Sequence, residues 1–187
     1  MRAVWKGRGM STIAETERLI IRYWQPDDIE EAFTIYGDPE VTRYLAGDAR
    51  DTTIEETREW LTKKMATQAE KAPLGLWAAE DRASGRVIGH ALLQYAPING
   101  DDRVEVGYAL ARSAWGKGYA TEIAQAMIQV GFDSLNLDEI YGVVIPENAA
   151  SRRVLEKVGM RNLGMGDYNG FPIEVLVLPR SSAAESM

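Results

Sequence analysis

Two glycines placed just before a predicted helix carry the clearest chemical signal in the sequence. Gly116 and Gly118 flank Lys117, between a predicted strand and a helix expected over residues 119–134. Glycine has no Cβ, and the first N–H groups of a helix lack intrahelical acceptors, so an anion can approach the backbone at the positive end of the dipole. Ala120 keeps the first turn narrow. The pattern predicts a cradle for a phosphate or diphosphate, and the alternative is a loop that only turns the chain.

Spacing and composition exclude several other kinds of site. The glycine spacing fits neither G-x-x-x-x-G-K-[ST] nor G-x-G-x-x-G, which argues against a P-loop or a Rossmann site. The 187 residues include no cysteine and one histidine, His90, which excludes disulfides, thiolate zinc sites and multi-histidine metal centres. We therefore expect no metal, and we expect His90 to be packed or hydrogen-bonded in the core.

Net charge and hydropathy restrict the kinds of partner that the protein can bind and its location in the cell. The formal net charge of −7 argues against a surface that coats nucleic acid. No apolar run is long enough to span a bilayer, and residues 1–10 lack the apolar stretch of a secretion signal. We expect a cytoplasmic protein that binds neither nucleic acid nor membrane. The oligomeric state stays open, with a homodimer as one alternative.

Strands and helices are expected to alternate along the chain. Hydrophobic periodicity predicts strands over 19–25, 74–80, 87–95, 104–111, 139–145 and 171–178, and helical stretches from 26, 39, 54, 119 and 148. This order predicts a mixed α/β or α+β sheet. We expect a loosely ordered segment over 1–15, one domain over 16–179 and a flexible tail over 180–187.

The glycine segment and four other motifs resemble one known family. Trp115–Glu122 (WGKGYATE) resembles the acetyl-CoA turn of the GCN5-related N-acetyltransferases (GNAT), in particular the branch with RimJ and RimL, the ribosomal-protein N-terminal acetyltransferases. The other matching motifs are Glu17–Arg22, Ile88-Gly89, Val106–Tyr108 and Asn148–Ser151 followed by Glu156–Met160. The resemblance implies a GNAT fold, with a mixed, mostly antiparallel sheet of about six to seven strands and about four helices. It also implies an acetyl-CoA-dependent N-acetyltransferase.

The resemblance further implies how acetyl-CoA is held. Backbone N–H groups around 116–120 bind its diphosphate, and the pantetheine arm pairs with backbone near Leu110 and Ala111, where two strands splay apart. The Asn148 side chain contacts the pantetheine, although it is also a suitable helix N-cap. The implied cofactor-binding residues are Leu110, Ala111, Arg112, Trp115, Gly116, Lys117, Gly118, Tyr119, Ala120, Asn148 and Ser151.

The amine that attacks the thioester must be neutral, so a base is needed. Strand alternation places Glu105 beside Gly107 and Ala109, where small neighbours leave room for a substrate. By resemblance, Glu105 orders the water that takes the amine proton. The alternative is a carboxylate that contacts solvent or Arg103.

The leaving thiolate needs a proton or a hydrogen bond. Many relatives carry a tyrosine in the last helix for this purpose, but the matching position here is Leu155. The resemblance places Ser151 near the acetyl-CoA sulfur, so Ser151 is the predicted donor. The alternative is a serine that only bonds back to its own helix. With no cysteine for an acyl-enzyme, we expect direct attack by the amine. Asp167 and Glu174 are weaker candidates for the base.

The acceptor amine is constrained only by charge. The segment from Pro26 to Trp60 holds 11 acidic and 3 basic residues, and the resemblance places it at the acceptor entrance. An acidic entrance would attract a cationic small molecule or a protein N-terminus, whereas a solvated helix surface is the alternative. Three functions stay open: a protein N-terminal acetyltransferase, a small-amine or antibiotic acetyltransferase, and a non-catalytic acyl-CoA-binding sensor. A phosphate-binding module unrelated to CoA is a further alternative.

Overall fold

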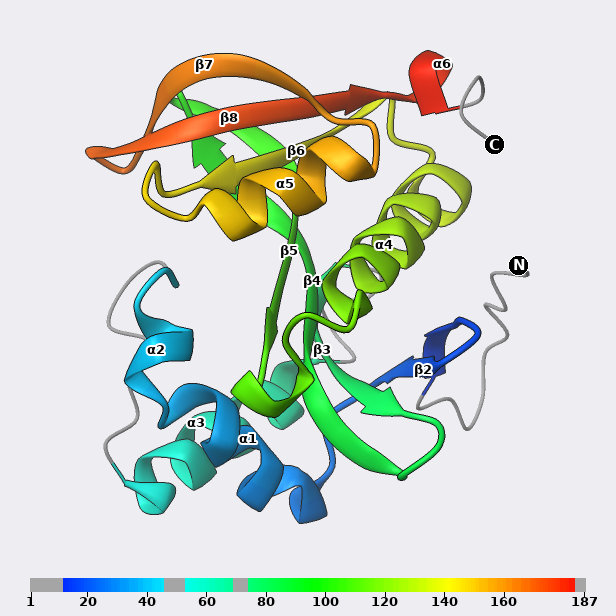
Figure 1. Cartoon of the computed structure of the whole chain (residues 1–187), viewed down its shortest axis with the longest axis vertical. Coiled ribbons are helices and arrows are strands. Elements are labelled where there is room, and N and C mark those ends of the chain that lie inside the picture. Colours follow the sequence, from blue (N-terminus) through cyan, green and yellow to red (C-terminus); the bar gives the residue numbers. More distant parts are fainter. Residues whose placement is uncertain (1–11, 46–52, 69–73, 184–187) are drawn as a thin grey trace.

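The computed structural model describes residues 12–45, 53–68 and 74–183 (Figure 1). The strands are β1 (Thr12–Glu15), β2 (Leu19–Arg22), β3 (Gly75–Asp81), β4 (Arg86–Ile98), β5 (Asp101–Leu110), β6 (Glu139–Val144), β7 (Arg161–Tyr168) and β8 (Phe171–Pro179). The helices are α1 (Ile29–Tyr36), α2 (Pro39–Thr42), α3 (Ile54–Thr67), α4 (Tyr119–Leu135), α5 (Ala149–Lys157) and α6 (Arg180–Ala183), with 3-10 turns η1 (Pro26–Asp28) and η2 (Arg112–Ala114).

The eight strands form one sheet with the order β1-β2-β3-β4-β5-β6-β8-β7. Among the described strands, only the β5–β6 pair is parallel, because α4 crosses over between these two strands. The expected mixed, mostly antiparallel sheet is therefore confirmed, with eight strands instead of six to seven. The expected set of about four helices corresponds to α1, α3, α4 and α5, and each of the other two described helices has only four residues.

Strands β5 and β6 separate along most of their length. The antiparallel β4–β5 ladder runs from Gly89↔Leu110 to Ile98↔Asp101, but β5 and β6 are in register only at Glu105↔Tyr141. Beyond Glu105, β5 continues without a strand partner on the β6 side, as the predicted splay requires. Figure 1 shows β4 and β5 connecting the part with β6, β7, β8 and α5 to the part with α1, α2 and α3.

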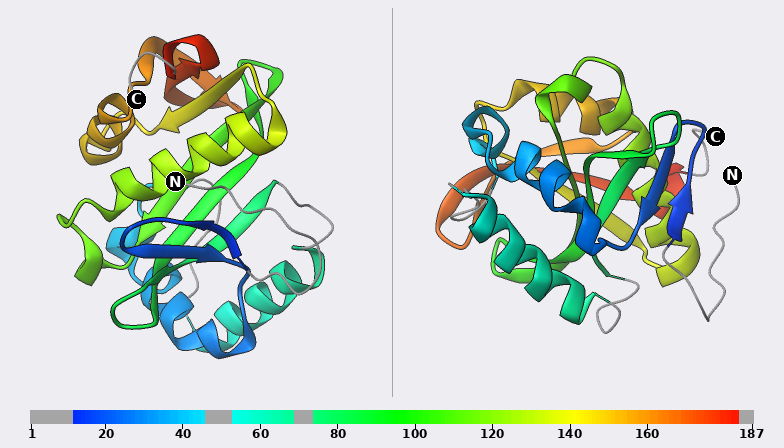
Figure 2. Two further views of the ribbon diagram at one scale, coloured as in Figure 1. Left: turned by 90° about the vertical axis from the view of Figure 1, so that its right-hand side faces the viewer. Right: turned by 90° about the horizontal axis from the view of Figure 1, so that it is seen from below.

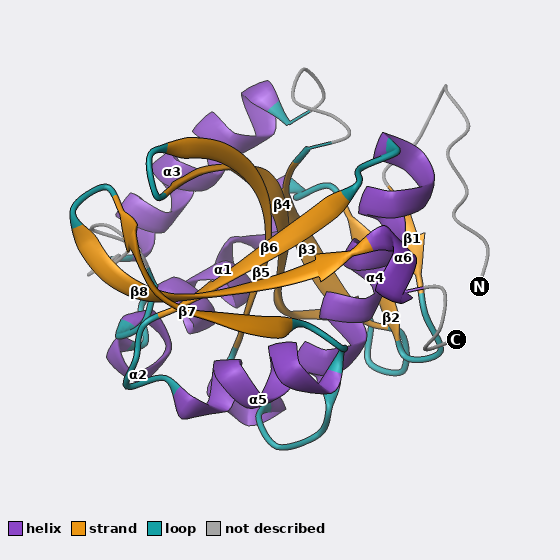
Figure 3. Cartoon of the chain, turned by 90° about the horizontal axis from the view of Figure 1, so that it is seen from above, coloured by secondary structure: helices purple, strands orange, loops and turns teal. Residues whose placement is uncertain are grey.

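Helices cover both faces of the sheet. Ile123 and Met127 of α4 pack in one hydrophobic cluster with Val106 and Leu110 of β5. Residues of α1 and α3 pack in a second cluster, which contains Ala109 and Ala111. The alternation predicted for β5 is thus confirmed. Figure 2 (left) shows α4 lying across the sheet, and Figure 3 shows the strands between α3 and α5.

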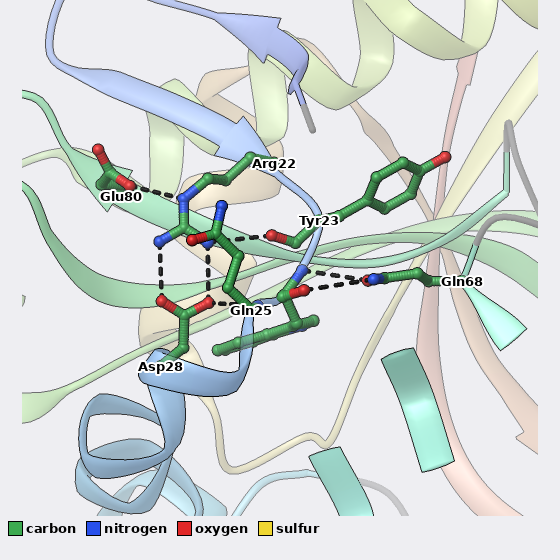
Figure 4. A network of polar contacts seen from close by, with 7 residues as sticks. Arg22, Tyr23, Gln25, Asp28, Gln68 and Glu80 are labelled. Atoms are coloured by element: carbon green, nitrogen blue, oxygen red, sulfur yellow. Dashed lines mark hydrogen bonds and ion pairs between the residues drawn. The ribbon is translucent and has the colours of Figure 1, made fainter. Parts of the chain in front are cut away.

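A buried ion cluster joins α1 to the sheet (Figure 4). Arg22 at the end of β2 donates to both oxygens of Asp28 at 2.8 Å and to Glu80 of β3 at 2.6 Å. The hydrogen bond with Asp28 is the main reason why the pKa of Arg22 is raised. Nearby, the Gln68 side chain exchanges two hydrogen bonds with the Trp24 backbone and so fixes the end of α3.

Two strands differ from the sequence expectation. Strand β1 lies inside the segment 1–15 that was expected to be loosely ordered, and it pairs with β2. Strand β7 was not predicted, because its residues are nearly all exposed and Gly164 and Gly166 interrupt any alternation. Helix α6 lies in the expected tail, of which residues 184–187 are outside the described residues, as are 1–11. Among the described helices, none has the length and apolarity to span a membrane.

Candidate active site

The glycine turn has the geometry that an anion site requires. Gly116 and Gly118 have φ values of 73° and 82°, which a residue with a Cβ adopts only with strain. A Cβ at Gly116 would meet no atom within 4 Å, so the backbone there is open on the outside. Gly118 is the N-cap of α4, and no side chain caps this helix. The unpaired first-turn N–H groups and the open approach fit a diphosphate.

The residues immediately before the turn hold the end of β5 in place. The Trp115 indole N–H donates to the Leu110 carbonyl oxygen at 2.8 Å, and the Ala111 N–H donates to Ile88 at 2.9 Å. These two backbone groups, expected to be free for the pantetheine arm, therefore have partners in the chain. The Arg112 guanidinium forms an ion pair with Asp38 at 3.0 Å. Arg112 thus binds the N-cap of α2, which is Asp38.

Glu105 lies where β5 and β6 meet, and its side chain is buried, at 4% exposure. Gln94 of β4 donates to Glu105 Oε1 at 2.7 Å. Burial raises the pKa of Glu105, whereas hydrogen bonds from Gln94 and Tyr168 oppose the rise. Arg103, the alternative partner, pairs with Asp101 and Glu139 instead. Glu105 is therefore a buried carboxylate whose described partners are all uncharged.

Ser151 lies on the other face of β5, at the start of α5. Its N–H donates to Asn148 Oδ1 at 3.1 Å, so the capping interpretation of Asn148 is confirmed. The Tyr108 hydroxyl lies 3.1 Å from Ser151 Oγ and 3.2 Å from the Ser151 carbonyl oxygen. Burial raises the pKa of Tyr108 to about 12. Leu155 is 1% exposed and belongs to the core, so its position in α5 is closed to any reacting group.

Tyr108 and Ser151 form a pair that the sequence analysis missed. The sequence analysis names Tyr108 only as part of the matching motif Val106–Tyr108 and assigns no role to it. The available signal was a tyrosine on the α5-facing side of a strand that already carried the candidate base. The spacing of 43 residues between Tyr108 and Ser151 hid the contact.

The two weaker candidates for the base have structural roles. Arg152 donates to both oxygens of Glu174, in one case at 2.6 Å, and Asn162 donates at 3.2 Å. Asp167 accepts from the Gly170 N–H in the β7–β8 turn at 3.0 Å. A cavity of about 390 Å³ lies beside Glu174 and Arg152, but neither Glu105 nor the glycine turn lines it. Across the described ranges, no cluster of three or more metal-binding side chains is found.

His90 is a core residue, as expected. Its Nδ1 lies 2.7 Å from the Tyr36 hydroxyl, and the two rings stack with centroids 5.7 Å apart. Complete burial lowers the pKa of His90 to about 4, so the ring is neutral near pH 7. The contact joins α1 to β4.

Comparisons with known proteins agree with this fold. The family model described as "Acetyltransferase (GNAT) domain" matches residues 18–161. The uncharacterized N-acetyltransferase YoaA of Bacillus subtilis is 33% identical over 160 residues, covering 83% of this chain and 86% of YoaA. A GNAT-family acetyltransferase from Bacillus anthracis matches with a TM-score of 0.74 and 26% identity, over 89% of this chain and 98% of that one. Mycobacterium smegmatis RimJ, solved in complex with CoA-disulfide, matches with a TM-score of 0.69 and 19% identity, over 89% and 86%.

The chain therefore belongs to the GNAT acetyltransferase family. It has the mixed α/β fold of that family, and it is an acetyl-CoA-dependent N-acetyltransferase. The uncapped glycine turn and the separated strands β5 and β6 are features of this chain that fit the donor.

Proposed function

We propose that the protein acetylates the N-terminal amine of a protein, by direct attack of the amine on the acetyl thioester, and that it belongs with the RimJ and RimL branch. The observation that carries the proposal is the arrangement of β5. Beyond Glu105 the strand is free of β6, and it bears Glu105 on one face and Tyr108 on the other. The proposed base Glu105 and the proposed proton donor Ser151, which Tyr108 contacts, thus lie on opposite sides of one open strand.

We assign the binding site of acetyl-CoA, the acetyl donor, to the glycine turn. The backbone N–H groups from Gly116 to Ala120 bind the diphosphate, because they lie at the uncapped, positive end of α4. Acetyl-CoA supplies the activated acetyl group. The side chains of Trp115 and Arg112 stabilise the fold around this site, because they bind the Leu110 carbonyl oxygen and Asp38 respectively.

Glu105 is assigned as the base that accepts the amine proton through a water molecule. An α-amino group has an ordinary pKa of about 8, so at pH 7 most of it must lose a proton before it attacks. Burial raises the pKa of Glu105, which brings it nearer to that of the amine. Its uncharged partners Gln94 and Tyr168 orient the carboxylate without neutralising it.

Ser151 is assigned as the donor to the leaving sulfur. The Asn148 cap fixes the first turn of α5 and hence the position of the Ser151 side chain. The Tyr108 hydroxyl, at 3.1 Å, can donate to Ser151 Oγ, which leaves the serine hydrogen free to point at the sulfur. The raised pKa of Tyr108 keeps the phenol protonated for this purpose.

The acceptor assignment is supported by charge. Exposed carboxylates of Glu30 on α1 and of Glu55, Glu56 and Glu59 on α3 lie on the acceptor-side helices. They favour a cationic acceptor, which includes a basic peptide and also a small amine. A small-amine acetyltransferase is therefore the second candidate, and a sensor without turnover is the third.

A panel of acceptors separates these functions. Peptides with free N-termini, the same peptides with blocked N-termini and a set of small amines are incubated with acetyl-CoA, and free CoA is measured with a thiol reagent. We expect CoA release and N-terminal acetylation only with the unblocked peptides. Turnover of small amines alone would favour the second candidate, and tight CoA binding without turnover would favour the sensor.

Variants test the assigned roles. Glu105→Gln and Ser151→Ala are expected to lower kcat by about tenfold or more while CoA binding is retained. The matched control is Asp102→Asn, an exposed carboxylate on the same strand, which should act as wild type. Unchanged kcat in both active-site variants would contradict the assignment.

A further inference from the structure

An arginine far from the glycine turn in sequence contacts that turn directly. Arg18 lies in the connection between β1 and β2, a hairpin that packs against α4 (Figure 2, left). Its Nη1 donates to the Lys117 carbonyl oxygen at 2.8 Å, across 99 residues of sequence. The guanidinium also lies 4.5 Å from the centroid of the Tyr119 ring, the first residue of α4.

The same guanidinium is held by a carboxylate on the first turn of α4. Arg18 Nε donates to Glu122 Oε2 at 2.7 Å, and Nη2 lies 2.6 Å from the same oxygen. The Arg18 N–H and the Thr16 hydroxyl both donate to the other oxygen, Oε1. Burial opposes ionisation, but these bonds outweigh it and hold the pKa of Glu122 below its usual range. The carboxylate is therefore charged near pH 7, and its contacts fix the orientation of Arg18.

The bond to Lys117 determines which way one peptide group points. A trans peptide unit directs its C=O and its N–H to opposite sides, so a Lys117 carbonyl that faces Arg18 turns the Gly118 N–H away from Arg18. Glycines on both sides of Lys117 make this unit easy to rotate. Rotation would break the bond and point an N–H at the positive guanidinium. The bond from Arg18 therefore favours the orientation that the turn has in the structure.

Charge provides a second effect. Glu122 on the first turn of α4 is an anion beside the place assigned to an anionic diphosphate. The Arg18 guanidinium pairs with Oε2 of this carboxylate through Nε and Nη2, and so cancels its charge locally. Without Arg18, the carboxylate would repel the ligand for which the turn is shaped.

We infer that Arg18 is a positioning residue for donor binding: it fixes the Lys117–Gly118 peptide and neutralises Glu122, so that the turn is ready for the diphosphate of an acyl-CoA. The inference rests on the assignment of the donor to the glycine turn. It gives a role to the contacts that join the opening segment Glu17–Arg22 to the segment Trp115–Glu122.

The test measures binding of CoA and of pantetheine, which lacks the diphosphate, by calorimetry. Arg18→Met is expected to weaken CoA binding by about tenfold, the loss of a charge-assisted hydrogen bond, and to leave pantetheine binding unchanged. The matched control is Arg82→Met. Arg82 has the same 42% side-chain exposure, and it bonds Glu15 and the Thr16 carbonyl but not the turn. It should bind CoA within about twofold of wild type.

Further variants separate the two effects. Adding Glu122→Gln to Arg18→Met should restore part of the CoA affinity, because the uncompensated charge is removed. Arg18→Lys keeps the charge and loses the forked geometry, so it should weaken CoA binding by a smaller factor, and it carries the test if Arg18→Met does not fold.

The possible outcomes are distinct. CoA binding of wild-type strength in a folded Arg18→Met or Arg18→Lys protein would overturn the inference. An equal loss of CoA and pantetheine binding would also overturn it, because the effect would not depend on the diphosphate. Failure of the wild-type protein to bind CoA would instead contradict the proposed donor site.

Discussion

Asp28 and Glu105 are buried to nearly the same extent, at 6% and 4% exposure, but their surroundings differ in one respect. Asp28 receives two hydrogen bonds from the Arg22 guanidinium. Glu105 receives its bonds from the uncharged groups of Gln94 and Tyr168. A buried carboxylate that is paired with arginine makes the fold depend on that arginine, whereas burial without a cation raises the proton affinity of a carboxylate, which chemistry can use. Burial alone does not distinguish the two roles.

The largest expected effect on stability comes from removal of Arg22, the cation beside Asp28. Arg22→Met leaves the buried Asp28 and the half-buried Glu80 without a counter-charge, and the free energy of unfolding should fall by about 3–5 kcal/mol. Urea denaturation measures this loss. Arg82→Met is the control and should stay within about 0.5 kcal/mol of wild type, since its ion pair is exposed. A small loss of stability in Arg22→Met would show that the surroundings of Asp28 and Glu105 differ less than the structure indicates.

Substitution of Glu105 should lower activity and not stability. Glu105→Gln removes the proposed base, and kcat should fall by about 100-fold with the donor affinity retained. Because the ionised carboxylate is disfavoured by burial, the free energy of unfolding at pH 8 should be equal to or above that of wild type. Steady-state kinetics and urea denaturation give both values. A large loss of stability would place Glu105 with Asp28.

Activity and stability should depend on pH in opposite directions through the ionisation of Glu105. Burial raises the pKa of Glu105 above its ordinary value of 4.5, so activity should fall on the acidic side as the carboxyl is protonated. The stability effect has the opposite sign: the contribution of Glu105 is most favourable below its unfolded pKa and is lost as pH rises through the folded pKa. In Glu105→Gln both dependences should disappear. They are read from kcat/KM and from denaturation midpoints over pH 4–8, and a retained acidic limb would assign it to another group.

The smallest expected effect concerns the neighbour of Glu105. Gln94 donates a hydrogen bond that lowers the pKa of Glu105, so Gln94→Leu should shift the acidic limb of kcat/KM to higher pH. Activity well above the limb should change little. Gln94→Glu is the contrasting variant, because a second carboxylate at this position should shift the limb further in the same direction. A shift to lower pH in either variant would contradict the assignment of the limb.

Much of the fold was predictable, because the central strands alternate and the longer helices have clear starts. Thr53 and Glu56 form a capping box at α3, and Pro26 opens the turn before α1. Strand β7 was not predictable, since neither its burial nor its composition alternates. In the site, the glycine turn and Glu105 could be named from local patterns. Tyr108, Gln94 and Arg18 act through contacts between distant strands and turns, which a single sequence does not reveal.

The long strand β4 has a mechanical consequence for the opening between β5 and β6. It pairs along its length with β3 and β5, and at Ile98 it also pairs with Tyr168 at the tip of β7. Tyr168 in turn donates to Glu105. The β7–β8 hairpin is therefore joined to β4, the strand that also pairs with β3. An outward movement of this hairpin would break the pairing at Tyr168 and disturb the hydrogen bond from Tyr168 to Glu105. Contacts within the chain therefore hold β7 to β4 next to the opening between β5 and β6.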